Sequence, residues 1–165
     1  MSNHTAESSG FRYVKAILCA GALAATFDLI FACTFHGIMS HVTPDRVLKS
    51  IASGWLGMDA FTGGIGTELL GFFSHYGILI GAAALYCLAA IKLPWMNRNA
   101  LVCGAVFGVC IYAFMHLVVL PLSNAPHFKA TVIGTTADFS MHVLVIGPTI
   151  ALVIRRWLGS APIHT

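Results

Sequence analysis

Histidine and aspartate residues inside apolar segments are the residues of this sequence that could do chemistry. An ionisable side chain at the centre of a membrane span costs about 2.5–3.5 kcal/mol on insertion scales, so such residues are candidates for function. Histidine is abundant here, with eight residues, whereas charged residues make up only 9% of the chain. The candidate polar cluster contains seven ionisable residues: Asp28, His36, Glu68, His75, His116, Asp138 and His142.

Imidazole beside carboxylate suits several kinds of chemistry. Histidine titrates near neutral pH, so a cluster could bind or relay protons. The same groups bind transition metals, and the candidate ligands are His75, His116, Asp138 and His142. His116 and His142 could instead hold a b-type haem between facing helices. The simplest alternative is structural, with each imidazole hydrogen-bonded to a neighbouring carbonyl and no cofactor bound. The spacing of these residues does not decide among the four.

The composition indicates the environment of the cluster. Hydrophobic residues make up 58% of the 165 residues and the mean hydropathy is +0.84, whereas a soluble domain usually has about 25% charged residues. A net charge of +3 without a basic stripe excludes a nucleic-acid partner. No Ser-His-Asp order, HExxH or GxSxG occurs, so the sequence favours a non-enzymatic membrane protein and predicts no catalytic residue.

Four apolar runs are long enough to cross a bilayer as helices, which takes about 20 residues. The runs cover residues 13–38, 68–91, 100–120 and 135–157. We therefore expect an all-α, integral membrane four-helix bundle formed by one domain over residues 13–158. A disordered cytoplasmic tail is expected over residues 1–12, and a second cytoplasmic tail over residues 159–165.

Basic residues predict how the bundle is oriented. With four spans, both termini and the loop 92–99 share one side, which holds six basic residues against three on the other. The positive-inside rule then predicts cytoplasmic termini. In this orientation each span offers one histidine to the outer end, and Asp28 lies deeper. Four such helices could form one outward-opening pocket with Asp28 at its floor.

A short amphipathic helix is predicted on the outer side, between the first and second spans. Thr43 is typical of an N-cap and Pro44 of a first helical position. Val47, Ile51 and Trp55 then recur on one helix face. We expect this helix to pack on the bundle as a lid, and a substrate gate is the alternative.

Glycines predict where helices approach one another. The second span carries Gly77 and Gly81, and the third carries Gly104 and Gly108, each pair in the GxxxG spacing that allows close helix packing. We expect these faces to pack the second and third spans together or to mediate a dimer. The pair Gly147-Pro148 predicts a bend in the fourth span.

A series of short motifs in spans two to four carries a family resemblance. The motifs, in order, are Ser74-His75-Tyr76-Gly77, Tyr86-Cys87, Pro94, Cys103-Gly104-Ala105, Met115-His116, Pro121-Leu122, His142 and Ile154-Arg155-Arg156. Their order resembles that of the YagU-type inner-membrane proteins of bacteria. The resemblance implies four spans in a bacterial cytoplasmic (inner) membrane, and it implies no substrate and no catalytic residues.

The sequence thus predicts a small transporter-like or pH-responsive membrane protein that uses an outer-leaflet His/Asp cluster. Its expected partner is the lipid bilayer, and no cofactor is expected. A haem- or metal-binding membrane redox subunit is one alternative. A structural or assembly protein in a homo-oligomer or membrane complex is another.

Overall fold

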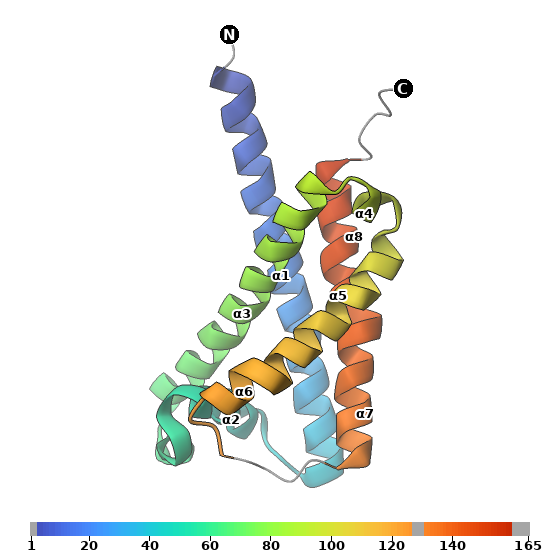
Figure 1. The fold of residues 1–165 in the computed structure, drawn as a ribbon. Helices are drawn as coiled ribbons and strands as arrows, with labels where there is room; N and C mark the ends of the chain where they lie inside the picture. Colours follow the sequence, from blue (N-terminus) through green and yellow to red (C-terminus); the bar gives the residue numbers. More distant parts are fainter. Residues whose placement is uncertain (1–2, 127–130, 160–165) are drawn as a thin grey trace.

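The computed structural model describes residues 3–126 and 131–159, which form helices and no strand. Four helical segments are long and apolar enough to cross a membrane: Gly10–Ser40, Ile65–Lys92, Ala100–Leu122 and Val132–Leu158. The prediction of an all-α chain with four spans is therefore confirmed. The start of the first span and the end of the fourth lie at one end of the bundle, here called the terminal end (Figure 1).

The first span belongs to a single helix, α1 (Asn3–Ser40). Residues from Asn3 onward are thus helical where we expected a disordered tail over residues 1–12. No proline interrupts this segment, and lengthening an existing helix needs no new nucleus. The helix ends where His41 adopts a left-handed conformation with φ 52°, and the Val42 N–H donates to the His36 carbonyl at 3.2 Å. The expected tail beyond Gly159 lies outside the described residues.

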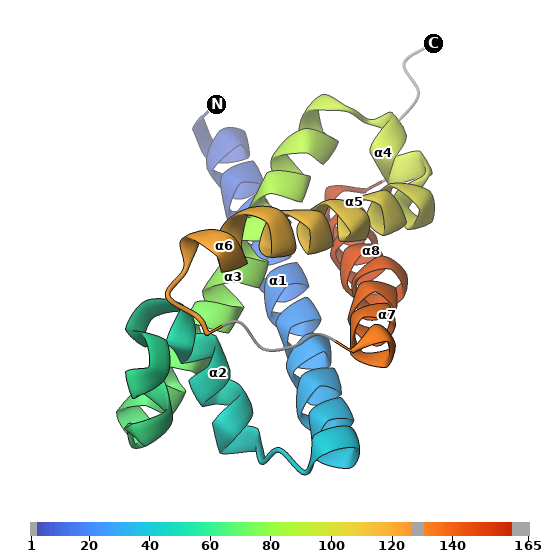
Figure 2. The same cartoon turned by 60° about the horizontal axis from the view of Figure 1, so that its bottom comes forward.

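The predicted amphipathic helix is present as α2 (Pro44–Leu56), followed by the 3-10 turn η1 (Gly57–Thr62). It packs along the second span, α3 (Ile65–Lys92), where Gly71 has no side chain to collide with the Leu48 carbonyl. The Asn124 N–H donates to Gly54 O and its side-chain amide donates to Trp55 O, both at 2.9 Å. Helix α2 is therefore fixed at the end of the bundle opposite the termini, here called the lid end (Figure 2).

The third and fourth spans each contain a π-helical turn. The third consists of α5 (Ala100–Phe114), η2 (Met115–Val119) and α6 (Leu120–Leu122), and the short helix α4 (Trp95–Arg98) joins it to α3. The fourth consists of α7 (Val132–Met141), η3 (His142–Ile146) and α8 (Gly147–Leu158).

Each π turn ends two residues before a proline, Pro121 or Pro148. Proline lacks an N–H and its ring collides with the carbonyl one turn back, so a wider turn accommodates it. The π turn η3 stands where Gly147-Pro148 predicted a bend.

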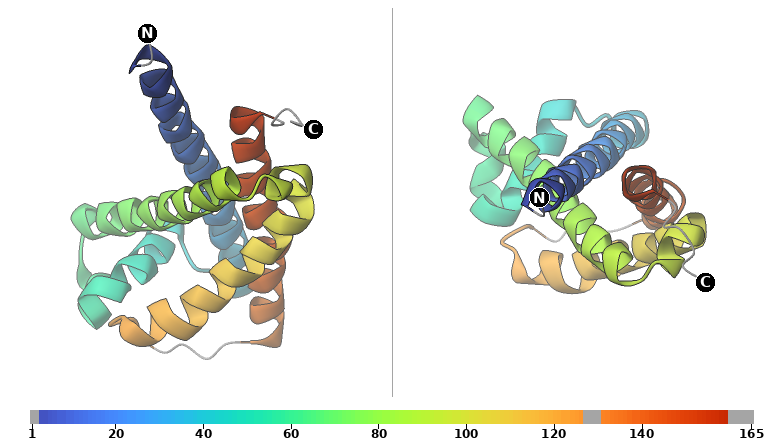
Figure 3. Two further views of the ribbon diagram at one scale, coloured as in Figure 1. Left: turned by 45° about the horizontal axis from the view of Figure 1, so that its top comes forward. Right: turned by 90° about the horizontal axis from the view of Figure 1, so that it is seen from above.

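Helix α1 packs between α3 and the fourth span, and α5 packs on α8 (Figures 1 and 3). Small residues allow the close approach to α1, because Ala20, Ala24 and Ala25 are fully buried and Gly21 faces the backbone of Ile80. The second and third spans, in contrast, contact each other little in the described part of the chain, where the rings of Tyr86 and Phe107 lie 5.1 Å apart.

The glycine pairs therefore do not pack the second and third spans together, and this expectation is corrected. A Cβ at Gly104 would stand 2.8 Å from the Pro148 Cα, and one at Gly108 would overlap the His142 carbonyl. The third span packs on the fourth because Gly147 there supplies the facing small residue. A Cβ at Gly77 or Gly81 would meet no described atom within 4 Å.

Candidate functional site

Each of the four spans contributes ionisable side chains to a polar region nearer the lid end. The contributing residues are Asp28 of α1, His75 of α3, His116 of η2, and Asp138 and His142 at the α7–η3 junction. Counted along their helices at 1.5 Å per residue, they lie about 9–18 Å from the lid ends of their spans. Five of the seven residues singled out in the sequence lie in this region, in two groups, and are here called the His/Asp cluster.

The first group of the cluster joins α1 to α3. The Nε2 atom of His75 lies 3.1 Å from the Ala25 carbonyl oxygen and 3.7 Å from the Asp28 Oδ2. Both side chains are mostly buried, at 11% exposed for His75 and 16% for Asp28. Because a carbonyl oxygen only accepts, the Nε2 of His75 carries the hydrogen. The Nε2–H group of His75 therefore links α3 to the Ala25 carbonyl and the Asp28 carboxylate of α1.

The second group is a carboxylate between two imidazoles. Asp138 Oδ1 lies 3.2 Å from His142 Nδ1, and Asp138 Oδ2 lies 3.5 Å from His116 Nε2. His142 Nδ1 also donates to the Asp138 backbone carbonyl at 2.9 Å. This group is more accessible than the first, since the Asp138 side chain is 37% exposed and that of His116 is 38% exposed.

The hydrogen bond of His116 fixes which ring nitrogen faces Asp138. Its Nδ1 lies 3.0 Å from the Tyr112 carbonyl and must donate, because the carbonyl cannot. In a neutral His116 the Nε2 is then a lone pair that faces the carboxylate of Asp138. Two acceptors at this separation repel unless one of them is protonated. A proton on His116 Nε2 or on Asp138 Oδ2 therefore stabilises the observed arrangement.

The two groups are near enough to interact through charge. Asp28 interacts through charge with His142 and Asp138 as well as with His75, although it belongs to the first group. The cluster thus holds two carboxylates and three imidazoles within the apolar part of the bundle. Each proton that an imidazole takes up offsets one carboxylate charge. The free-energy cost of burying the cluster therefore depends on how many protons it holds.

The ring of Tyr112 positions the second group. It stacks on His116 with centroids 4.1 Å apart and contacts His142 edge-on at 5.7 Å. Both histidines belong to π turns, which place side chains where a regular helix would not and often occur at functional sites. Tyr112 was not predicted as part of the site, although it stands one helical turn before His116 and so shares its face.

Two residues of the predicted cluster lie elsewhere. His36 is exposed near the end of α1, where its ring contacts Phe35 edge-on. Glu68 pairs with Lys49 of α2 at 3.5 Å, so this ion pair joins α3 to the lid helix α2. Glu68 shares a helix face with His75, but seven residues separate them by about 10 Å along the axis.

The arrangement gives the cofactor alternatives no support. In residues 3–126 and 131–159, no three His, Cys, Asp or Glu side chains are grouped so that they could hold a metal ion. Of the candidate ligands, His116 and His142 both pair with Asp138, whereas His75 pairs with Asp28 of another helix. A haem between His116 and His142 would have to displace the Asp138 carboxylate that bridges them.

The chain matches no protein family model, no curated protein and no solved structure. The resemblance to the YagU-type family therefore stays a prediction. The site is defined by its geometry.

Proposed function

We propose that this chain is a multi-pass membrane protein that takes up and releases protons at its His/Asp cluster. It would act as a small transporter-like or pH-responsive protein of a bacterial inner membrane. Four helices with the length and hydropathy of membrane spans support the membrane assignment. The observation that carries the function is the carboxylate of Asp138 between His116 and His142.

Protonation would change how strongly the spans hold together. The cluster joins α1 to α3 through the His75 hydrogen, and it joins η2 to α7 through Asp138. Imidazole titrates near neutral pH, so modest changes in pH alter the charge balance between these helices. A pH-responsive protein needs a titrating group that bridges separate elements, and both groups bridge separate helices.

The accessible group is the entry point for protons in this proposal. His116 and Asp138 are each more than a third exposed, whereas His75 and His142 are buried. A proton would arrive at the His116–Asp138 pair and be shared with His142 through the same carboxylate. Asp28 and His75 would form the inner end of the path.

The test is proton flux into liposomes that contain the purified protein and a trapped pH-sensitive dye, driven by a potassium diffusion potential. We expect flux from the wild type and a loss of about tenfold or more in Asp138→Asn and His116→Gln, because each removes one partner of the shared proton. The matched control is His36→Gln, which changes an exposed histidine of α1 outside the cluster.

Two results would contradict the proposal. Equal flux in Asp138→Asn and the wild type would remove the role of the cluster. If the wild type conducts no protons, its fluorescence melting temperature should still vary with pH between about 5 and 8, where histidine titrates. A melting temperature that is constant over this range, in a folded protein, would rule out the pH-responsive form as well.

A further inference from the structure

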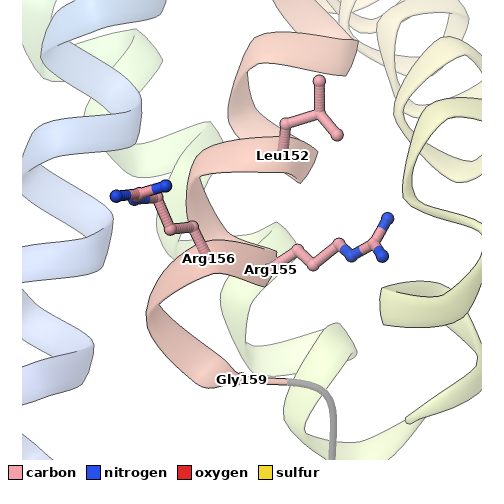
Figure 4. Close-up of a pocket in the computed structure, with 4 residues that line it drawn as sticks. All are labelled: Leu152, Arg155, Arg156 and Gly159. Atoms are coloured by element: carbon pink, nitrogen blue, oxygen red, sulfur yellow. The ribbon is translucent and has the colours of Figure 1, made fainter.

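A groove of about 530 Å³ lies at the terminal end of α8, far from the His/Asp cluster. Four residues line it: Leu152, Arg155, Arg156 and Gly159. Their spacing of three, four and seven residues places them on one face of the helix. The opposite face carries Ile150 and Ile154, which are fully buried. The groove therefore lies on the side of α8 opposite its buried face, and Figure 4 shows the four residues that line it.

Arg155 and Arg156 give the groove a net positive charge. Both are exposed, and no ion pair with either is present among the described residues. Their side chains extend to opposite sides of α8, with Arg156 on the side of α1 (Figure 4). Guanidinium groups donate paired hydrogen bonds that match phosphate oxygens.

Arg12 of α1 strengthens this charge. Its Nη2 donates to the Trp157 carbonyl at 2.7 Å and also lies 3.4 Å from the Leu158 carbonyl. The last carbonyls of a helix carry the partial negative charge of the helix dipole. Because Arg12 occupies these carbonyls, Arg155 and Arg156 are not needed there and stay available to an anion.

The position of Leu152 indicates which kind of anion fits. Leu152 lies one turn deeper than the arginines, within the apolar span, and is 41% exposed. The groove thus combines an apolar residue with two cations that flank it from either side of α8, near the end of the span. An amphiphile with a phosphate above an acyl chain matches this order, whereas free phosphate uses only the arginines. We propose that the groove is a binding site for the phosphate headgroup of an anionic phospholipid.

The experiment uses the full-length protein in a neutral detergent, titrated separately with phosphatidylglycerol, phosphatidylcholine and inorganic phosphate. Native mass spectrometry counts bound lipid, and tryptophan fluorescence gives the melting temperature. We expect phosphatidylglycerol to bind and to raise the melting temperature, with little effect from the other two. Arg155→Gln with Arg156→Gln should weaken phosphatidylglycerol binding about thirtyfold, as expected for two basic groups near a membrane surface.

Two control variants separate this site from general charge. Arg98→Gln removes an exposed arginine of α4 at the same end of the bundle and should leave the lipid response unchanged. Arg155→Lys with Arg156→Lys keeps the charge and should retain most of the binding. The proposal is overturned if phosphatidylcholine binds as well as phosphatidylglycerol, if inorganic phosphate gives the same shift, or if the glutamine variant binds like the wild type. If the glutamine variant does not fold, the comparisons of phosphatidylglycerol with phosphatidylcholine and with inorganic phosphate, made on the wild type, still test the proposal.

Discussion

The hydrogen-bond partners of the cluster histidines fix which ring nitrogen carries a hydrogen. His116 donates from Nδ1 to the Tyr112 carbonyl, and His75 donates from Nε2 to the Ala25 carbonyl. Nitrogen-15 NMR of histidine-labelled protein at a pH above the imidazole titration should therefore show different tautomers for these two residues. Asp138→Asn should leave the tautomer of His75 unchanged, because Asp138 does not contact it. The same tautomer at His75 and His116 would contradict the assignment.

A second prediction at the residue scale concerns Asp45, at the start of the lid helix. A hydrogen bond with the Thr43 side chain, followed by the hydrogen bond and charge of Lys49, lowers the pKa of Asp45 below its ordinary value. A lowered folded-state pKa means that ionised Asp45 stabilises α2 above its ordinary pKa of about 3.9, and that this contribution is lost as the pH falls through the lowered value.

Asp45→Asn should therefore loosen α2 at about pH 7, and the difference from the wild type should vanish as the pH falls through the lowered pKa of Asp45. Acrylamide quenching of tryptophan fluorescence measures this, since the Trp55 indole N–H donates to Ser74 across the lid contact at 3.0 Å. A difference that grows as the pH falls would have the wrong sign.

Contacts within one helix of the cluster can be predicted from the sequence, but contacts between helices cannot. Asp138 and His142 stand four residues apart, and helix geometry alone brings them together. The contacts of His75 with Ala25 and of His116 with Asp138 depend on how neighbouring helices are rotated, which no spacing within one helix specifies. Glu68 was misplaced for a related reason, because Lys49 on another element pairs with it.

At the scale of the elements, the two glycine pairs should respond differently to substitution. Gly104→Leu or Gly108→Leu adds a side chain where the backbone of the fourth span already stands, and such overpacking costs about 1–3 kcal/mol or more. Gly77→Leu and Gly81→Leu add theirs where no described atom lies within 4 Å. Melting temperatures in detergent should fall for the first pair and stay near the wild type for the second.

The matched pairs also test the dimer alternative. Leucine at Gly77 and Gly81 would block a close helix contact between two copies of the chain. Loss of a dimer on size-exclusion chromatography, without loss of melting temperature, would favour that alternative. Equal destabilisation by both glycine pairs would contradict the packing described here.

The four spans were predictable because hydropathy and length nearly determine a membrane helix. Which spans pack together was not, because lipid provides no hydrophobic drive that distinguishes one apolar face from another. The GxxxG glycines of the third span were recognisable in the sequence, but their partner in the fourth span was not. Gly147, which faces them, indicated only a bend in its own helix. The small residues around Gly21, which bring α1 against α3, were likewise indistinguishable from ordinary span residues.

The lid helix α2 should behave as a fixed cap. A Cβ at Gly54 would lie 3.8 Å from the Ser123 Cβ, a separation typical of disulfides. Gly54→Cys with Ser123→Cys should therefore crosslink on oxidation and leave proton flux unchanged, with each single variant as its control. Flux that stops on oxidation and returns with reductant would show that α2 opens as a gate.

At the scale of the whole molecule, the side of the membrane that the cluster samples depends on the orientation of the bundle. The terminal end carries Arg12, Arg98, Arg155 and Arg156, and the His/Asp cluster lies nearer the lid end. The positive-inside rule counts basic residues close to span ends, so it predicts a cytoplasmic terminal end.

Single cysteines test this orientation in intact cells with a membrane-impermeant thiol reagent. Ser50→Cys in α2 should be labelled from outside, whereas Asn99→Cys, between α4 and α5, should react only after the cells are permeabilised. The unsubstituted chain is the control for its five native cysteines. The reverse pattern would place the cluster on the cytoplasmic side. The accessible pair His116–Asp138 would then sample the nearly constant cytoplasmic pH, and a response to external acid would lose its physical basis.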